Sequence, residues 1–397
     1  MSALFISDAG AEQSSISLAE VRAFALEQSP LVQATDSEYA TRLAETVQLT
    51  TLPNPELGVG VSVPVNWKES RGDNELDASI GQPLRLSHFG TRRAVSDLIQ
   101  KMASAERQAE LFKLLKEIDL GYLRLWVLQQ QKRFLATAQS SAASRSREIS
   151  QGLTRGIFSE GDQKIFFAEE ARFEAGLLGV EGDIKAGEAN LTRLVGRSML
   201  SRSLVKPDMA AHFTVDAVRA KEKNSAIGAS QRADLLVELA NAQKRLARKD
   251  SFPEFTPQLM ASRNDEGTTF LGAGITIPLP FSDRNQSQII QREGELRAAE
   301  ARRNYVKEGA FSDEISALVD AVNLALSEAE LFESKVVPAF QDSLRFQERQ
   351  FREGSGSIFQ IWQTQRELFE SQAKALELWT KAFSLRIELE ILVGQEL

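Results

Sequence analysis

The chain of 397 residues contains no cysteine and only two histidines, His88 and His212. The absence of cysteine excludes disulfide bridges, thiol catalysis, thiolate metal sites and a lipid-bearing N-terminal cysteine. The sequence also lacks a His-x-His cluster, a nucleophile elbow and a P-loop. The glycines of GVGV (residues 58–61) and GAGI (residues 272–275) lie in alternating segments rather than before helices, so they do not predict a phosphate cradle. We therefore expect no catalytic residues, no cofactor and no resident metal.

Long apolar runs and basic tracts are absent too. No stretch approaches the run of roughly 18 apolar residues that a transmembrane helix needs. The net charge of -8 argues against nucleic acid as a partner. Near the start, Leu4-Phe5-Ile6 is too short for the apolar region of a signal peptide, although Ala9-Gly10-Ala11 has the small-x-small form of a cleavage site. Residues 1–16 are therefore expected to be a flexible tail or the remnant of a clipped signal.

What the sequence does contain is a long internal duplication. A segment that begins at Gly156 and one that begins at Gly354 each carry serine three residues later and end about forty residues on in Leu-Val-Gly. The offset is 198 residues at both ends, and the same offset maps Pro55-Glu56 onto Pro253-Glu254. A repeat of this length predicts one structural unit present twice. We place the first repeat at 17–199 and the second at 200–397.

Each repeat contains one segment in which apolar residues alternate with small or polar ones. In the first, Leu57, Val59 and Val61 alternate with glycine and serine, and a second alternating run follows a polar turn. This period of two predicts a β-hairpin with one apolar face, within 55–86 in the first repeat and 255–279 in the second.

The remainder of each repeat has helical periodicity. Leu111, Leu115, Ile118, Tyr122 and Leu125 recur at intervals of four and three, which is coiled-coil spacing. We predict long helical hairpins that turn near Gly156 and Gly354. The predicted helices cover 17–50 with a kink or split at Pro30, 91 to about 152, about 162–194, 216–250, 285 to about 352 with a bend at Pro338, and 357–392.

Neither element is complete in one chain. Strands of about ten residues with dyad alternation fit a membrane β-barrel, but membrane barrels have at least about eight strands and this chain has four. A soluble sheet packed on helices explains the strands alone equally well. Long helical hairpins with narrow apolar stripes, however, also need lateral neighbours. Open strand edges and long hairpins therefore both predict a ring of several copies.

Several short motifs occur in the order found in the outer-membrane efflux protein family, the TolC-like channels. They are Leu52-Pro53-Asn54-Pro55-Glu56-Leu57, Gln82-Pro83-Leu84 with Arg92-Arg93, Ile277-Pro278-Leu279-Pro280-Phe281 with Asp283-Arg284-Asn285, and Gly354 and Ser357 with Gln365-Arg366-Glu367-Leu368. The chain resembles this family over nearly its whole length. The Pro-Leu-Pro-Phe segment looks closest to the branch that serves heavy-metal resistance pumps.

The resemblance implies a mainly α-helical fold with a membrane β-barrel. Three copies would contribute twelve strands to one barrel in the outer membrane of a Gram-negative-type bacterium, and their helices would form a tunnel across the periplasm. Loops 66–74 and 264–268 would face outside, and the link 197–216 would form a belt with the termini. Such a channel is the passive exit duct of a tripartite efflux pump for metal ions or drugs. Its partners would be outer-membrane lipid, a periplasmic membrane-fusion adaptor and an inner-membrane transporter of the RND type.

By the same resemblance, the hairpin turns would form the periplasmic tip where the adaptor docks and the tunnel narrows. The tip residues are then Gly156, Ser159, Gly354, Gly356 and Ser357. Acidic residues often ring the constriction in the family, but the second repeat has Gln360 and Gln363 at those positions. Glu160 and Asp162 are the remaining acidic candidates, and a ring of three Asp162 side chains would attract cations. An acid at a helix start stabilised by the helix dipole explains Asp162 equally well.

Two other classes of function remain open on sequence. A soluble coiled-coil scaffold explains the long helices but not the paired alternating segments, and an exit duct for type I protein secretion has the same fold as an efflux duct. A scaffold would stay in solution without detergent, whereas a channel would not.

Overall fold

A computed structural model describes residues 15–63, 74–208, 212–279 and 284–397. The chain divides into two compact units. The hairpin unit comprises Met1–Asp36, Ala109–Gly228 and Ser312–Leu397, and the sheet unit comprises Ser37–Gln108 and Ala229–Phe311. Each unit draws segments from both halves of the sequence, so packing does not follow the two predicted repeats. Their boundary at residue 200 stays a prediction.

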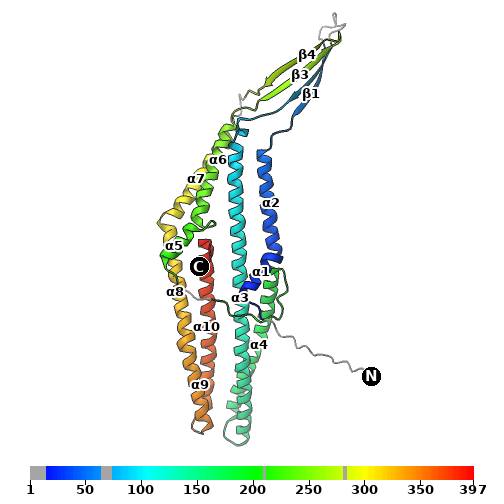
Figure 1. The fold of residues 1–397 in the computed structure, drawn as a ribbon. Helices are drawn as coiled ribbons and strands as arrows, with labels where there is room; N and C mark the ends of the chain where they lie inside the picture. Colours follow the sequence, from blue (N-terminus) through cyan, green and yellow to red (C-terminus); the bar gives the residue numbers. More distant parts are fainter. Residues whose placement is uncertain (1–14, 64–73, 209–211, 280–283) are drawn as a thin grey trace, which may run out of the picture. The chain divides into compact units, whose positions relative to one another are not determined.

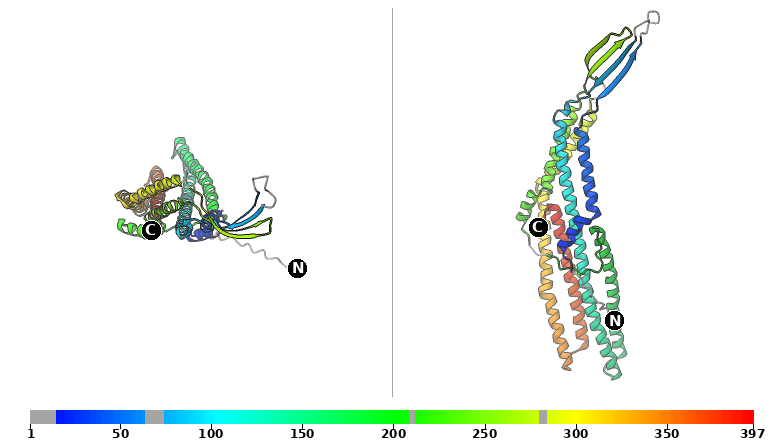
Figure 2. Two further views of the ribbon diagram at one scale, coloured as in Figure 1. Left: turned by 90° about the horizontal axis from the view of Figure 1, so that it is seen from above. Right: turned by 45° about the vertical axis from the view of Figure 1, so that its right-hand side comes forward.

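The sheet unit contains the two hairpins that the alternating segments predict. Four antiparallel strands are ordered β1 (Glu56–Ser62), β2 (Glu75–Gly81), β3 (Thr256–Asn264) and β4 (Thr269–Thr276). Figure 2 shows them from two further sides as one curved layer. The outer edges of β1 and β4 have no partner strand among the described residues. Most of the predicted loop 66–74, and the motif residues Pro280, Phe281 and Asp283, lie outside the described residues.

The strand register places apolar residues on one face of the sheet. Leu57 lies opposite Ile80, Ile80 lies opposite Leu259, and Leu259 lies opposite Ala273. This face is largely exposed: the exposed fractions of Leu57, Leu259 and Leu271 are 75%, 64% and 84%. Successive side chains alternate across a strand, so the opposite face carries mainly small and polar residues, with Met260 and Phe270 as exceptions. A Cβ atom on Gly58 would lie 2.7 Å from Ser79 Oγ, so glycine there suits the close strand packing.

Four helices run into or out of the strands, as Figure 1 shows for the sheet unit. They are the later part of α2 (Pro30–Thr50), the start of α3 (Thr91–Thr154), α6 (Ala229–Lys249) and α7 (Gln286–Lys307), with a short 3-10 turn, η1, at Leu86–His88. Helices α6 and α7 pack side by side around Val237, Ala240, Leu296 and Ala299. Within the described part of the chain, no helix is both long and apolar enough to cross a membrane.

The hairpin unit holds two long antiparallel helix pairs. One pair is α3 with α4 (Glu160–Val195), and the other is α9 (Val337–Arg352), which continues α8 (Gly309–Leu331), with α10 (Ile358–Val393). Helices α1 (Leu18–Gln28) and α5 (Val215–Asn224) complete this unit. The pairs share a core in which Leu135, Ala138 and Ala142 of α3 and Phe173 of α4 contact Phe369 of α10. The coiled-coil spacing seen in the sequence therefore corresponds to buried helix contacts.

The predicted split at Pro30 is confirmed. Helix α1 begins with a capping box between Ser17 and Glu20 and ends before Ser29, whose ψ of 126° is extended. Proline disfavours the helical conformation in the residue before it, which accounts for the conformation of Ser29. Helix α2 then starts with Pro30 itself, a position where the missing N–H costs nothing.

Two predictions of continuous helix are wrong. The segment 216–250 breaks at Ser225–Gly228, where a Cβ atom on Gly228 would lie 2.5 Å from Glu222 O. The segment 285–352 breaks at Glu308, whose ψ is 165°, and widens into a π turn, η2, at Phe332–Val336. This π turn directly precedes Pro338, which has no N–H to continue the α-helical ladder. The bend that Pro338 predicts is therefore a local widening, while the complete break occurs thirty residues earlier.

Candidate functional site: hairpin turns and clasped helix ends

The two hairpin turns use the same backbone hydrogen bonds. In the first turn Ile157 N donates to Gly152 O at 2.9 Å and Gly156 N to Leu153 O at 3.0 Å. In the second, Ser355 N donates to Gln350 O and Gly354 N to Phe351 O, both at 3.0 Å. Gly156 and Gly354 have φ of 74° and 80°, the left-handed conformation in which helices commonly end. The prediction that both glycines form turns is confirmed, whereas their role in docking stays a prediction.

Each turn contains one further glycine that permits a close contact, but at different positions. In the first, a Cβ atom on Gly152 would lie 2.4 Å from the ring of Phe158. In the second, a Cβ atom on Gly356 would lie 2.6 Å from Phe351 N. The 198-residue offset aligns Phe158 with Gly356 and Gly152 with Gln350, so a bulky residue replaces glycine at both positions. The sequence analysis did not predict the contact between Gly152 and Phe158, although both residues and their spacing of six can be read from the sequence.

The helix starts after the turns also differ. Ser159 forms a capping box with Asp162: Asp162 Oδ2 accepts hydrogen bonds from Ser159 N and Ser159 Oγ, both at 2.8 Å. The bond from the Ser159 backbone, followed by the bond from its side chain, holds the pKa of Asp162 below its ordinary value. Ser357 makes no such bond, and Gln360 and Gln363 are exposed. One oxygen of Asp162 therefore accepts the capping hydrogen bonds. This agrees with the interpretation of Asp162 as an acid that stabilises the helix start.

One aromatic cluster joins both hairpins near the turns. Ile149, Phe166 and Ile358 are buried, and Phe158, Phe351 and Trp362 pack against them. The ring of Phe166 lies 5.7 Å from that of Phe359 and 6.3 Å from that of Trp362. Aromatic pairs at these separations stabilise beyond the area they bury. The four helix ends at the turns therefore form one packed unit rather than two separate loops.

At their other ends, α4 and α10 are held by two similar arrangements that we call the first and second clasp. In the first clasp, buried Ser29 Oγ donates to Leu194 O at 2.6 Å, and in the second, buried Ser225 Oγ donates to Gly394 O at 2.6 Å. Gly196 and Gly394 end these helices with φ of 78° and 69°. A Cβ atom on Gly196 would lie 2.5 Å from Gln28 O, and one on Gly394 would lie 2.8 Å from Ile227 O. Each clasp therefore closes a helix end against the break in a neighbouring helix.

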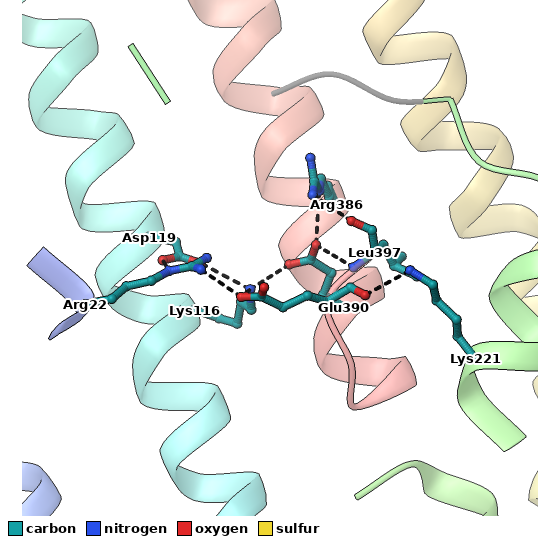
Figure 3. A network of polar contacts seen from close by, with 8 residues as sticks. Arg22, Lys116, Asp119, Lys221, Arg386, Glu390 and Leu397 are labelled. Carbon is teal, nitrogen blue, oxygen red and sulfur yellow. Dashed lines mark hydrogen bonds and ion pairs between the residues drawn. The ribbon is translucent and has the colours of Figure 1, made fainter. Parts of the chain in front are cut away.

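Beside the second clasp lies a buried ionic network (Figure 3). Lys116, only 1% exposed, contacts Asp119, Glu390 and Glu396 at 3.2, 2.9 and 3.0 Å. Burial alone would lower the pKa of Lys116, but the charges of Asp119 and Glu390 outweigh it, and the net shift is upward. Arg22 of α1 reaches Asp119 at 2.5 Å and Glu396 at 2.8 Å. The network therefore connects α1, α3 and α10.

The same network holds the C-terminal residues. Arg386 donates to Glu390 at 3.0 Å and to Leu397 O at 2.9 Å, and Lys221 donates to Glu396 O at 3.1 Å. Burial alone would raise the pKa of Glu396, but hydrogen bonding to Lys116 and the nearby cations lower it below its ordinary value. Sequence reasoning missed this network, because its members are spread from residue 22 to residue 397.

The N-terminal segment and the link after α4 are held to α3 by one tyrosine. Ile16 forms a parallel β-bridge with Leu204. The hydroxyl of Tyr122 lies 2.8 Å from Ile16 O and 2.7 Å from Val205 O. Burial raises the pKa of Tyr122 to about 12, so the hydroxyl keeps its proton to donate. The expected association of the link with the N-terminal segment is present within this unit.

No grouping of three or more His, Cys, Asp or Glu side chains suited to a metal ion occurs among the described residues. The carboxylates of the ionic network are matched by Arg22, Lys116 and Arg386. These charges therefore have a structural role, because they pair with one another and hold the helices together.

Comparison with known proteins identifies the fold and the family. Residues 219–395 match the family model described as "Outer membrane efflux protein". The second half of the chain therefore matches the outer membrane efflux protein family. Members of this family form outer-membrane channels with a periplasmic helical tunnel, and they serve as exit ducts of efflux pumps. The predicted family and the predicted duct function are confirmed at this level.

Individual relatives are distant in sequence. The "Cobalt-zinc-cadmium resistance protein CzcC" of Cupriavidus metallidurans is 22% identical over 364 residues, which are 88% of this chain and 83% of the relative. Crystal structures of VceC from Vibrio cholerae and CmeC from Campylobacter jejuni both match with a TM-score of 0.74, at 18% and 11% identity. The alignments cover 96% of both chains for VceC, and 95% of this chain and 85% of the other for CmeC. They confirm the predicted fold class for the single chain.

Proposed function

We propose that three copies of this chain form one outer-membrane channel, with four strands from each copy in a twelve-stranded barrel. The exposed apolar face of the sheet supports this proposal most directly. Leu57, Leu259 and Leu271 are each at least 64% exposed on that face. Alternating lipid-facing and lumen-facing residues are the pattern of membrane strands, and the open edges of β1 and β4 would pair with neighbouring copies.

The hairpin unit offers a second surface for neighbouring copies. Along α4, exposed residues recur at intervals of four and three, and along α9 a second exposed series has the same spacing. The two series are Glu160, Lys164, Phe167, Ala171, Glu174 and Leu178, and Ala339, Asp342, Phe346, Arg349 and Glu353. Phe167, Leu178 and Phe346 are 67%, 68% and 58% exposed. This is the spacing of a coiled-coil seam, so we propose that α4 of one copy packs beside α9 of the next.

In such a trimer the hairpin turns are the periplasmic tip. We assign adaptor docking to the surface formed by Gly156, Ser159, Gly354, Gly356 and Ser357, and the constriction to Glu160, Asp162, Gln360 and Gln363. The exposure of Glu160, Gln360 and Gln363 supports this assignment. The capping bonds of Asp162 leave it less free to contact cargo than Glu160.

The proposed cargo is metal cations, exported without any chemical step by this chain. The small and polar face of the sheet supports this choice: it carries Glu56, Glu75 and Asp77 but neither lysine nor arginine among the described strand residues. A lumen lined by carboxylates favours cations. The relative named for cobalt, zinc and cadmium resistance supports the same cargo. Energy would come from an inner-membrane transporter of the RND type, coupled through a membrane-fusion adaptor.

The decisive experiment is the molar mass of the protein extracted with detergent from the outer-membrane fraction, after expression behind a working signal peptide. A mass of three chains supports the channel. A soluble monomer or dimer from a folded, exported chain contradicts it and favours the coiled-coil scaffold.

A second measurement tests the cargo. The purified trimer in a planar bilayer should show a reversal potential that favours potassium over chloride, and D77N should reduce that preference. An anion-selective or unselective channel would contradict metal cations as cargo while leaving the channel intact.

A further inference from the structure

The four junctions between strands and helices in the sheet unit are bonded to one another. Gln82 Nε2 donates to Pro53 O at 2.7 Å, which joins the end of β2 to the start of β1. Leu84 and Phe255 exchange two backbone hydrogen bonds of 2.9 Å. Asn285 Nδ2 donates to Ala247 O at 3.0 Å, which joins the start of α7 to the end of α6. We call residues 51–55, 82–97, 244–255 and 284–292 the junction collar.

The junction collar is basic in an otherwise acidic chain. It contains nine lysines or arginines and three aspartates or glutamates, whereas the whole chain has a net charge of -8. The basic residues are Arg85, Arg92, Arg93, Lys244, Arg245, Arg248, Lys249, Arg284 and Arg292. A local excess of this size, opposite in sign to the chain, indicates an anionic partner.

Most acids near the collar are already paired. Arg92 contacts Asp250 at 3.1 Å and Arg85 contacts Glu254 at 2.8 Å. Glu293, just beyond the collar, pairs with both Lys244 and Arg248. Four exposed basic residues remain that form no ion pair with a described residue: Arg93, Arg245, Lys249 and Arg284. Exposed charges without an acidic partner are available to a ligand.

Exposed apolar side chains accompany these charges at every junction. Leu52, Phe89, Phe252 and Leu279 are 49%, 63%, 57% and 69% exposed, and each lies in or beside a different junction. Next to the collar, a groove of about 840 Å³ is lined by Pro55 and Gln82 of the junctions, by Pro257 of β3, and by the apolar strand residues Ile80, Leu259, Ala273 and Ile275. Figure 1 shows the strands rising directly from these junctions.

We propose that the junction collar binds the phosphate headgroups of anionic phospholipids, with their acyl chains on the apolar face of the sheet. Three observations carry this proposal: the basic excess, the apolar side chain at each junction, and the continuity of the groove with the apolar face. Basic residues beside an apolar membrane surface attract anionic lipid at about 1 kcal/mol per residue, and girdles of aromatic residues flank the apolar band of membrane barrels. The proposal rests on the proposed function, because it requires the sheet to lie in the outer membrane.

The test uses the full chain, purified in detergent, with one charge-removing variant and one matched control. R245Q/K249Q removes two unpaired collar charges from α6. R297Q/R302Q removes two exposed charges from α7 outside the collar, and neither residue forms an ion pair with a described residue. Native mass spectrometry counts bound lipid with phosphatidylglycerol or phosphatidylcholine as the probe.

The wild type should retain phosphatidylglycerol in preference to phosphatidylcholine, and added salt should weaken this preference. R245Q/K249Q should lower the affinity for phosphatidylglycerol by roughly thirtyfold, and the control should not change it. Equal losses in both variants, or no headgroup preference in the wild type, would overturn the proposal. If R245Q/K249Q loses the oligomeric mass of the wild type, R93Q/R284Q serves in its place, with the same expected result.

If the proposed channel function is wrong, the same experiment gives a different result. In that case the wild-type chain would not enter the detergent-extracted membrane fraction, and no lipid of either kind would be retained. A wild type that inserts but ignores the headgroup contradicts the junction collar alone.

Discussion

The two hairpin turns share a backbone path but differ in the side chains that secure it. The first turn has a capping box, Ser159 with Asp162, and buries Phe158 against Gly152. The second has neither, and instead packs Gly356 against the backbone of Phe351. Duplicated segments can therefore keep one conformation while exchanging the contacts that hold it. Where the conformation is shared, equivalent substitutions should have equal effects, and where the contacts differ, they should not.

The ionic network at the second clasp should show the largest difference between the halves. The position equivalent to Glu390 in the first half is Thr192, so only the second clasp carries a buried carboxylate beside Lys116. K116M would leave Asp119 and Glu390 without this cation, and breaking a buried pair typically costs about 3–5 kcal/mol. Thermal unfolding of the detergent-solubilised protein, followed by circular dichroism, would measure the loss.

The control for this substitution is K221M. Lys221 donates one exposed hydrogen bond to Glu396 O, so its loss should cost no more than about 1 kcal/mol. If K116M and K221M lowered the unfolding temperature equally, the buried network would not be what secures the second clasp.

Alanine substitutions of glycine should destabilise the protein more at the clasps than at the hairpin turns. Ala at Gly196 or Gly394 must adopt a positive φ and also place Cβ within 2.8 Å of backbone atoms. Ala at Gly156 or Gly354 faces only the positive φ, since no described atom lies within 4 Å of its Cβ. The conformation alone costs about 1–2 kcal/mol, so G196A and G394A should each lose clearly more stability than G156A and G354A in the same melts. Similar losses at all four sites would show that the clasp contacts relax at little cost.

Sequence reasoning predicted the repeated elements because their signals are local. Alternation at Leu57, Val59 and Val61 predicts a strand, and proline at residue 30 predicts a helix break, without knowledge of the rest of the chain. The break at Ser225–Gly228 has no proline and was missed, because it is stabilised by Gly394, which directly follows the last helix of the chain. The Lys116 network was also missed, because its residues lie far apart in the sequence.

The candidate tip residues show the same limit. Periodicity and glycine placed both turns correctly, but the sequence left two roles open for Asp162. Asp162 caps the helix because its carboxylate is oriented toward Ser159. No pattern of residue types fixes that orientation, since Ser357 starts an equivalent helix without a capping bond.

The two N-cap serines should differ by a smaller amount. S159A removes a side chain that caps α4, which typically costs about 1 kcal/mol. Ser357 makes no side-chain capping bond, so S357A should lie within about 0.5 kcal/mol of the wild type, as is usual for surface substitutions. Hydrogen exchange of the first helical turns of α4 and α10 would localise the effect. Equal acceleration of exchange in the two variants would contradict the difference between the turns.

The smallest expected effect is the pH dependence of the stability that the Asp162 capping box adds to the first turn. A substitution in the second half should introduce the same pH dependence there. Because hydrogen bonds from Ser159 lower the pKa of Asp162 in the folded chain, its contribution is present above the ordinary carboxyl value of 3.8 and is lost as the pH falls through the lowered value. The unfolding temperature of the wild type should therefore exceed that of D162N at pH 6, and this difference should shrink toward pH 3. Q360D places an acid at the equivalent position after Ser357, so it should raise the unfolding temperature at pH 6 but not at pH 3. A gain that does not depend on pH would mean that the new side chain acts by packing rather than by capping.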